Sequence, residues 1–493
     1  MKAELIVNKN FTIGEIDKRI YGSFVEHLGR CVYGGIYEKD HESSDDNGFR
    51  GDVIELIKEL NVPIVRYPGG NFVSGYNWED GTGDKSKRPR KVDLAWKSIE
   101  PNEVGIDDFQ EWARKAGTEV MMAVNLGTRG PMEAMNLVEY CNGTTDTYYA
   151  NMRRENGFES PFGIKTWCLG NEMDGPWQTC AKSAEEYGKI AREAAKMMKW
   201  LDPDIELVAC GSSNYNMPTF GEWEYTVLDA AYKHVDYISM HQYYNNAANN
   251  TPDFLGRSVH LDAFIKSVAA ICDAVKAKKH SEKTVNLSLD EWNIWYHSGK
   301  DVAEDWKVGA KRLEDVYNFE DALLVGSILI TLQNNCDRVK MACMAQLVNV
   351  IAPIMTENGG KAWAQTIFYP YMLASNNGRG TALRPVIKCD SYTTSDKFTV
   401  PYLEASVVDI PESRTLTVFA VNKSLDEDMT LSLDLGGFDG AKLISHTELY
   451  CDDLKAENTK DTANVYPAER EVDASMDSVN LKKHSFNMLK FAY

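Results

Sequence analysis

Residues 165–177 read KTWCLGNEMDGPW, and the order of residue types in this stretch indicates how the rest of the chain is arranged. A short apolar run is followed by Asn171 and Glu172 and then by residues typical of loops. In a barrel of parallel strands, each buried strand delivers polar side chains from its carboxyl end to a site on one face. The stretch is therefore interpreted as a buried parallel strand that carries Glu172 to such a site.

A second stretch, residues 285–295, reads VNLSLDEWNIW and repeats this plan with Glu291 at the end of its strand. Hydrolysis of a glycosidic bond needs two carboxyl groups, one to protonate the leaving oxygen and one to attack the anomeric carbon or to activate water. A single Glu after a strand is more often a plain surface residue. Two such sites, each with Trp and Asn nearby, favour the catalytic interpretation.

Length and composition bound the class of protein. A chain of 493 residues exceeds what one hydrophobic core usually supports, so we expect two domains. A hydrophobic content of 43% and a charged content of 26% are typical of soluble globular proteins. A net charge of −20 and a pI near 5.0 disfavour nucleic acid or an anionic membrane as a partner, whereas a neutral sugar is unaffected.

The N-terminal apolar run is too short for a signal peptide, and no window approaches a membrane span, which predicts a cytoplasmic protein. The ten cysteines are scattered without a Cys-x-x-Cys pair, so we expect reduced thiols and neither disulfides nor a zinc site. Cys168 lies inside the apolar run before Glu172, which argues against a catalytic thiol there.

From residue 17 to about residue 375 the chain alternates between strand-like and helical patterns. The expected strands span residues 21–24, 63–67, 120–125, 166–169, 206–210, 237–241, 285–289 and 339–345. The expected helices span residues 52–60, 106–116, 131–140, 184–200, 222–232, 261–278, 317–333 and 362–374. Eight strands separated by helices predict an α/β fold, a (β/α)₈ TIM barrel over residues 17–382.

After residue 380 the helical periodicity ends and short alternating runs follow, which predicts a jelly-roll-like β-sandwich over residues 383–493. Its expected strands span residues 400–408, 415–421, 430–435, 441–449 and 485–491. Two strands near the N-terminus, at 4–7 and 11–13, have no helix after them. We expect residues 1–16 to complete the sandwich, and the two domains to be packed together because no flexible linker separates them.

Polar or aromatic residues follow every predicted barrel strand, as expected of a pocket for a ligand with many hydroxyl groups. They include Glu26, Arg66, Asn71, Asn171, His241, Tyr243 and Gln346. Taken singly, the amides are as often loop or capping residues, and Arg66 is equally suited to a structural ion pair. His241 and Tyr243 are as often packed residues at a sheet end.

Competing chemistries lack their signatures in this sequence. There is no His-Glu-x-x-His, no Gly-x-Ser-x-Gly, and no phosphate-loop or dinucleotide-binding glycine pattern. The nine histidines show no ligand spacing. The sequence therefore predicts neither a metal nor a cofactor.

Four motifs closely resemble the α-L-arabinofuranosidases of glycoside hydrolase family 51: RYPGGN at 66–71, GNEMDGPW at 170–177, HQYY at 241–244 and DEWN at 290–293. The resemblance spans the chain, including the sandwich. It implies that Glu172 is the general acid/base and Glu291 the nucleophile of a retaining double displacement. Carboxyl groups in such a mechanism lie about 5–5.5 Å apart, against roughly 6.5–9.5 Å in an inverting one.

The resemblance also implies the surroundings of the sugar. It places Glu26, Asn71, Asn171, Tyr243 and Gln346 around a terminal arabinofuranose, with Asn171 bonded to the 2-hydroxyl. Tyr243 and Arg66 would position Glu291, and His241 would support the site. Trp96, Trp177 and Trp295 would line the side of the leaving group, although Trp177 could equally be simple packing.

The implied activity is exo-acting release of terminal non-reducing α-L-arabinofuranosyl groups from arabinan, arabinoxylan or, in a cytoplasmic setting, their oligosaccharides. A homo-oligomer, often a hexamer, is implied by the resemblance alone. The closest alternative is another retaining glycosidase on this barrel, a β-xylosidase or an endoglucanase, because pocket shape sets ring and anomeric preference. A non-catalytic carbohydrate-binding protein is disfavoured by the two intact carboxyl groups.

Overall fold

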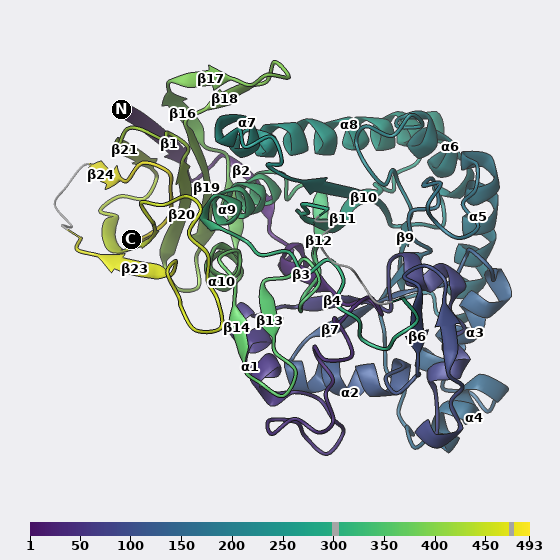
Figure 1. Ribbon diagram of the computed structural model, residues 1–493. Coiled ribbons are helices and arrows are strands. Elements are labelled where there is room, and N and C mark those ends of the chain that lie inside the picture. The colour runs from purple at the N-terminus through teal and green to yellow at the C-terminus, as the bar shows by residue number, and fades with distance from the viewer. Residues whose placement is uncertain (298–304, 473–477) are drawn as a thin grey trace.

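The computed structural model describes residues 1–297, 305–472 and 478–493. One part is a closed barrel surrounded by helices, and a second part made of sheets packs beside it (Figure 1). Both termini lie in the sheet-rich part (Figure 1), because the N-terminal strand pairs there with strands from the C-terminal end of the chain.

Eight parallel strands form the barrel and follow one another around it in chain order. They are β3 (Gly22–Phe24), β4 (Ile64–Tyr67), β7 (Glu119–Ala123), β8 (Thr166–Leu169), β9 (Glu206–Ala209), β10 (Tyr237–Tyr244), β11 (Asn286–Ile294) and β12 (Val339–Ala345). Pairing of β12 with β3 closes the ring. The predicted barrel is confirmed, but β10 and β11 extend beyond the predicted ends at 241 and 289.

Helices cover the outside of the barrel (Figure 1). They are α1 (Gly51–Leu60), α2 (Ile106–Ala116), α3 (Pro131–Asn142), α4 (Tyr148–Glu155), α5 (Ala184–Leu201), α6 (Glu222–Ala231), α7 (Thr251–Leu255), α8 (Arg257–Lys278), α9 (Phe319–Asn334) and α10 (Phe368–Asn377). Short 3₁₀ turns are η1 (Lys18–Tyr21), η2 (Asn71–Gly75), η3 (Trp78–Gly81) and η4 (Lys85–Lys87).

The helix predicted over residues 362–374 is wrong in its first half. Residues Ala362–Ala364 form strand β14, which pairs antiparallel with β13 (Ile354–Thr356), and α10 begins only at Phe368. Pro370 explains why α10 starts late. Proline is tolerated in the first turn of a helix, where Pro370 lies, but it would break a helix that began at residue 362. Gln365 is also fixed outside the helix, because its side chain donates to the carbonyl oxygens of Asp315 and Ala352.

The apolar run before Glu172 packs on both sides of the barrel wall. Trp167 and Leu169 belong to the large core shared with the surrounding helices, whereas Cys168 belongs to the cluster inside the barrel. The Trp167 side chain is fully buried, and its Nε1 donates to the carbonyl oxygen of Ile164 at 3.0 Å. This ring therefore anchors the strand that carries Glu172.

Replacing Trp167 with Ala is expected to lower the free energy of unfolding by about 3–5 kcal/mol, because a large cavity forms and the Ile164 carbonyl loses its donor. Thermal unfolding followed by circular dichroism measures the loss. Trp200→Ala is the matched control, since Trp200 is 75% exposed and should change stability by no more than about 0.5 kcal/mol. Equal midpoints for the two variants would contradict the anchoring role.

Two sheets form the sandwich, and each one contains an N-terminal strand. One sheet has the order β16-β1-β21-β24 and the other β2-β15-β19-β20-β25-β22-β23. The bounds are β1 (Lys2–Asn8), β2 (Thr12–Glu15), β15 (Thr381–Leu383), β16 (Val386–Cys389), β19 (Leu403–Ile410), β20 (Thr415–Asn422), β21 (Met429–Gly436), β22 (Lys442–Leu449), β23 (Pro467–Arg470), β24 (Ser478–Leu481) and β25 (Ser485–Ala492). The N-terminal strands thus complete the sandwich as predicted, while the domain boundaries at 16 and 382 stay predictions.

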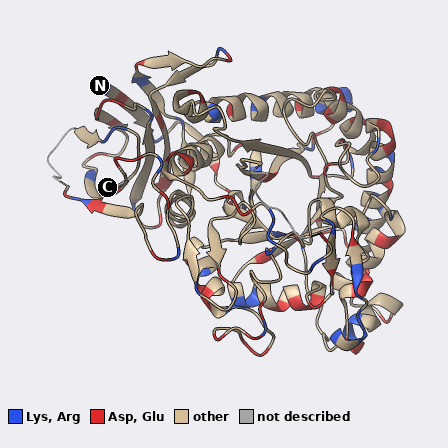
Figure 2. Ribbon diagram, in the orientation of Figure 1, with Lys and Arg blue, Asp and Glu red and all other residues tan. Residues whose placement is uncertain are grey.

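In the described part of the chain, two further short hairpins, besides the β13–β14 pair, lie outside these sheets. They are β5 (Lys91–Asp93) with β6 (Ser98–Glu100), and β17 (Ser391–Thr393) with β18 (Thr399–Pro401). Lys and Arg are interspersed with Asp and Glu over the outer helices (Figure 2). Within the described ranges, no helix combines the length and the apolar character that crossing a membrane would need.

Candidate active site

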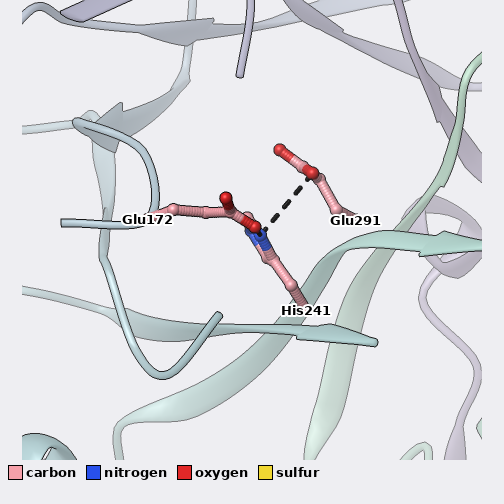
Figure 3. Close-up of side chains that lie close together, drawn as sticks. All are labelled: Glu172, His241 and Glu291. Carbon is pink, nitrogen blue, oxygen red and sulfur yellow. Dashed lines mark hydrogen bonds and ion pairs between the residues drawn. The ribbon is translucent and has the colours of Figure 1, made fainter. Parts of the chain in front are cut away.

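A sharp turn after β8 presents Glu172 to the barrel mouth. Gly170 has a φ of 93°, in the left-handed region that glycine adopts without a Cβ clash, and Glu172 itself has a φ of 41°. The turn directs the Glu172 side chain toward β10 and β11 (Figure 3). The glycine between the strand and the Asn-Glu pair therefore serves the placement of the carboxyl group.

Irregular pairing in β10 and β11 brings consecutive side chains to the same site. The register of β10 against β11 shifts just before His241, and that of β11 against β12 shifts between Leu289 and Trp292. Successive side chains of a regular strand point to opposite faces, so a shifted register changes which of them face the barrel axis. As a result, both Asp290 and Glu291 contact His241.

Three side chains from different elements converge at the mouth of the barrel: Glu172, His241 and Glu291 (Figure 3). One carboxylate oxygen of each Glu and a ring nitrogen of His241 lie within 4.8 Å of one another. His241 Nδ1 is 2.8 Å from Glu172 Oε1 and 3.6 Å from Glu291 Oε2. The two glutamates singled out in the sequence therefore face each other across a short gap.

Glu291 is held from two sides. Arg66 Nη1 donates to Glu291 Oε1 at 2.7 Å, and the Tyr243 hydroxyl donates to Oε2 at 2.9 Å. Burial raises the pKa of Glu291 above its usual value, and the neighbouring His241 and Arg66, which lower this pKa, offset the effect of burial only in part. The contacts match the positions predicted for Arg66 and Tyr243, whose roles stay predictions.

Glu172 is bonded through both of its oxygens. His241 Nδ1 faces Oε1, and Trp177 Nε1 donates to Oε2 at 2.5 Å. Trp177 is 51% exposed, so it is not a simple core residue and stands at the rim of the site. The carboxyl group is thereby fixed in orientation between a buried imidazole and an exposed indole.

A cavity of about 530 Å³ opens onto this pair of carboxyl groups. Nine of the predicted site residues line it: Glu26, Asn71, Trp96, Glu172, Trp177, Tyr243, Glu291, Trp295 and Gln346. Arg66, Asn171 and His241 are at most 2% exposed and lie behind the wall. Arg66 and His241 are bonded to Glu291 and Glu172, which line the cavity, and Asn171 is bonded to Arg66. Its polar groups and indole rings suit a ligand with hydroxyl groups and C–H faces.

Asn171 is only 1% exposed and lies behind the cavity wall. Its Oδ1 accepts from Arg66 Nη2 at 2.8 Å, and its Nδ2 donates to Gln178 Oε1 at 3.1 Å. One amide hydrogen is left for a ligand. The 2-hydroxyl contact therefore stays a prediction, and the observed role of Asn171 is to support Arg66.

Glu26 also lines the cavity and is bonded by three donors. These are the backbone N–H of Phe72 and Trp96 Nε1, each at 2.9 Å, and Gln346 Nε2 at 3.2 Å. Burial raises the pKa of Glu26 to about 8, and the nearby Glu291 charge adds to the shift. A Cβ at Gly70 would lie 2.7 Å from Glu26 Oε2, which explains the glycine there.

Several residues of the site were missed by the sequence analysis. Asp290 contacts His241, and Asp174 accepts from the backbone N–H of Ser213 at 3.0 Å. Burial raises the pKa of Asp174 to about 6. Each of these acids lies within two residues of a predicted catalytic Glu. The sequence does not indicate whether the side chain of an acid near a strand end points into the site or away from it. His297, which stacks on Trp295 at 3.7 Å, has no sequence signal at all.

The converging triad does not fit a metal ion, although two carboxylates and an imidazole are common ligands. Both nitrogens of His241 are engaged, by Glu172 and by Asp290. The guanidinium of Arg66 lies 2.7 Å from Glu291 and would repel a cation. The arrangement instead suits proton transfer beside a nucleophilic carboxylate.

Comparison with known proteins agrees with this geometry. The chain matches the family profile of the α-L-arabinofuranosidase 1 domain over residues 56–263, and that of the α-L-arabinofuranosidase C-terminal domain over residues 290–485. Together these profiles cover most of the barrel and the sandwich.

Individual relatives match over nearly the full length. An intracellular exo-α-(1→5)-L-arabinofuranosidase 1 of Bacillus subtilis is 61% identical over 468 residues, covering 94% of this chain and 93% of that protein. An intracellular exo-α-(1→5)-L-arabinofuranosidase of Halalkalibacterium halodurans is 55% identical and covers 99% of both chains. The solved structure of a family 51 α-L-arabinofuranosidase from Bifidobacterium longum superimposes with a TM-score of 0.95 at 44% identity, covering 99% of both chains. The chain therefore belongs to the family 51 α-L-arabinofuranosidases, as its motifs indicate.

Proposed function

We propose that this protein, an exo-acting α-L-arabinofuranosidase, cleaves its substrate by a retaining double displacement. Glu291 attacks the anomeric carbon while Glu172 protonates the leaving oxygen, and Glu172 then activates the water that hydrolyses the glycosyl ester. Arg66 and Tyr243 orient Glu291, and the pocket residues bind the terminal sugar. Activity on an α-L-arabinofuranoside is the first expectation.

One observation carries the proposal. An oxygen of Glu172 and an oxygen of Glu291 lie within 4.8 Å of each other on the same cavity. That gap supports direct attack by a carboxylate, because an inverting enzyme keeps its carboxyl groups roughly 6.5–9.5 Å apart to hold a water between them.

The preferred substrate is proposed from the relatives. The relatives from Bacillus subtilis and Halalkalibacterium halodurans are named intracellular exo-α-(1→5)-L-arabinofuranosidases. We therefore propose short α-(1→5)-linked arabino-oligosaccharides as substrates, cleaved inside the cell, in preference to branched α-(1→2) or α-(1→3) substituents. A homo-oligomer, a hexamer by resemblance, completes the proposal and is tested by light scattering after gel filtration.

The deciding experiment compares 4-nitrophenyl α-L-arabinofuranoside with 4-nitrophenyl β-D-xyloside and cellulose. We expect turnover of the furanoside at least about a hundredfold faster, since pocket contacts that are built for one ring leave polar groups unpaired with another. Proton NMR of the first product in deuterated buffer should show the α-anomer before mutarotation. Preference for the xyloside or for cellulose would favour the alternative glycosidases, and inactivity on all three would favour a binding protein.

Ionisation of Glu291 is expected to set the acidic limb of the pH profile of kcat/KM. Because the nucleophile must be ionised and burial raises its pKa, kcat/KM should begin to fall at a pH above the usual 4.5 of a glutamate. Arg66→Met removes a charge that lowers this pKa, so the limb should move upward by about 1–3 pH units. The profile of kcat/KM on the nitrophenyl furanoside measures it. An acidic limb that stays in place would contradict the role of Arg66.

A further inference from the structure

Asp290 lies directly behind the carboxyl pair and has no contact with the cavity. It is 1% exposed and immediately precedes Glu291 on β11. The register shift between Leu289 and Trp292 turns it toward His241 instead of away from the site. Burying an acid costs free energy unless it is hydrogen-bonded or paired with a charge, so the contacts of Asp290 indicate its role.

The contacts of Asp290 define its charge. Oδ1 lies 2.9 Å from His241 Nε2, while Oδ2 faces the Cys168 thiol at 3.7 Å and Arg66 Nε at 3.8 Å. The thiol can donate and the guanidinium is cationic, so both complement an acceptor oxygen on Asp290. A carboxylate only accepts hydrogen bonds, so His241 Nε2 carries a proton.

The proton on Nε2 limits what the other ring nitrogen can do. Nδ1 lies 2.8 Å from Glu172 Oε1, a distance that requires one hydrogen between the two atoms. Either a protonated Glu172 donates to neutral His241, or the imidazolium donates to the Glu172 carboxylate. In both cases the pair holds a single proton at the acid that cleavage requires.

The charges around His241 favour retaining that proton. Glu172 and Asp174 face it from the turn after β8, Asp290 and Glu291 from β11, and Arg66 of β4 lies behind the acids. Burial lowers the pKa of His241, but the surrounding carboxylates outweigh burial and raise this pKa well above its usual value. A proton shared with Glu172 is therefore stabilised by the acids of the turn after β8 and of β11.

We infer that Asp290 is a positioning residue that acts through His241: it keeps Nε2 protonated, so that Nδ1 and Glu172 Oε1 share the proton delivered to the leaving oxygen. This inference rests on the acid/base role proposed for Glu172. As the anomeric C–O bond breaks and the bond to Glu291 forms, the shared proton passes to the glycosidic oxygen and the alcohol leaves neutral. In the second step, Glu172 takes a proton from the attacking water, which restores the pair with no net change at Asp290.

Asp290→Asn tests the inference, because it removes the charge and keeps the shape. Loss of the anion makes the shared proton easier to lose, so the basic limb of kcat/KM should move to lower pH by about 1–2 units. The limb should move whether or not kcat falls. Asp107→Asn is the matched control. Asp107 on α2 is also buried, but it accepts from the Tyr140 hydroxyl on α3, away from His241, so its variant should keep the wild-type limb.

A second measurement needs no variant and no substrate. In wild-type protein labelled with ¹⁵N-histidine, the His241 Nε2 resonance should stay that of a protonated nitrogen throughout the active pH range, and Asp290→Asn should change it. Loss of that proton in the wild type, or an unmoved basic limb in Asp290→Asn, would overturn the inference even if furanosidase activity stands. A wild type inactive on α-L-arabinofuranosides would instead overturn the proposed function.

Discussion

Glu291→Ala is expected to lower turnover of arabinofuranosides by about 10⁴–10⁶-fold, because the covalent intermediate can no longer form. The loss should be similar for nitrophenyl and oligosaccharide substrates, since both need the same nucleophile. Arg66 and Tyr243 donate to the Glu291 carboxylate, which alanine lacks. Neither residue can therefore compensate for the missing nucleophile. Initial rates on both substrates measure the effect.

Azide turns this loss into a test of geometry. It fits the space vacated by the carboxylate and attacks the sugar from the same side, so Glu291→Ala with azide should yield the β-arabinofuranosyl azide, of inverted configuration. Glu119→Ala is the control at the opposite end of the barrel, where Glu119 pairs with Lys18 and should affect stability alone. Activity retained in Glu291→Ala without azide would mean that another group is the nucleophile.

The barrel and both catalytic candidates could be predicted because their signals are local. An apolar run ending in a polar pair predicts a buried strand that delivers a side chain to the mouth of the barrel. Glu172 and Glu291 both line the cavity there, although Glu291 lies within β11, which continues to Ile294. The alternation of strands and helices predicts a closed barrel, which brings Glu172 and Glu291 to the same face. Pairing of β1 and β2 with distant strands was also predicted, because neither has a helix after it.

What sequence periodicity missed depends on contacts between distant segments. The register shifts in β10 and β11 are set by neighbouring strands, so nothing in DEWN indicates that Asp290 as well as Glu291 would reach His241. Ala362 was assigned to a helix because its segment pattern is helical, while its actual partner is β13. The hydrogen bonds that join the Asn171 amide to Arg66 and Gln178 also connect distant segments and were not predicted.

The surroundings of the two glutamates suggest how one pocket separates their tasks. Glu291 faces the guanidinium of Arg66 and a phenol donor, which favour a carboxylate. Glu172 faces an imidazole that can share a proton and an indole that can only donate. Two like residues within 4.8 Å thus have partners suited to a nucleophile and to an acid/base.

Glu172→Ala should separate substrates by their leaving groups. For α-(1→5)-arabinobiose, whose leaving alkoxide must be protonated, kcat/KM should fall by about 10²–10⁴-fold. For the nitrophenyl furanoside it should change little, because nitrophenolate leaves without an acid. The kcat on the aryl substrate should still fall together with KM, since the glycosyl-enzyme accumulates when the base for its hydrolysis is missing.

Azide again distinguishes the roles, now through the opposite stereochemistry. In Glu172→Ala it attacks the glycosyl-enzyme from the side where water normally enters, so the product should be the α-azide, of retained configuration. Glu172→Gln is the matched variant, because its amide keeps the shape and can accept from Trp177 but gives no proton to the leaving group. Equal losses on arabinobiose and on the nitrophenyl furanoside would rule out an acid role for Glu172, because only the first substrate depends on protonation for its departure.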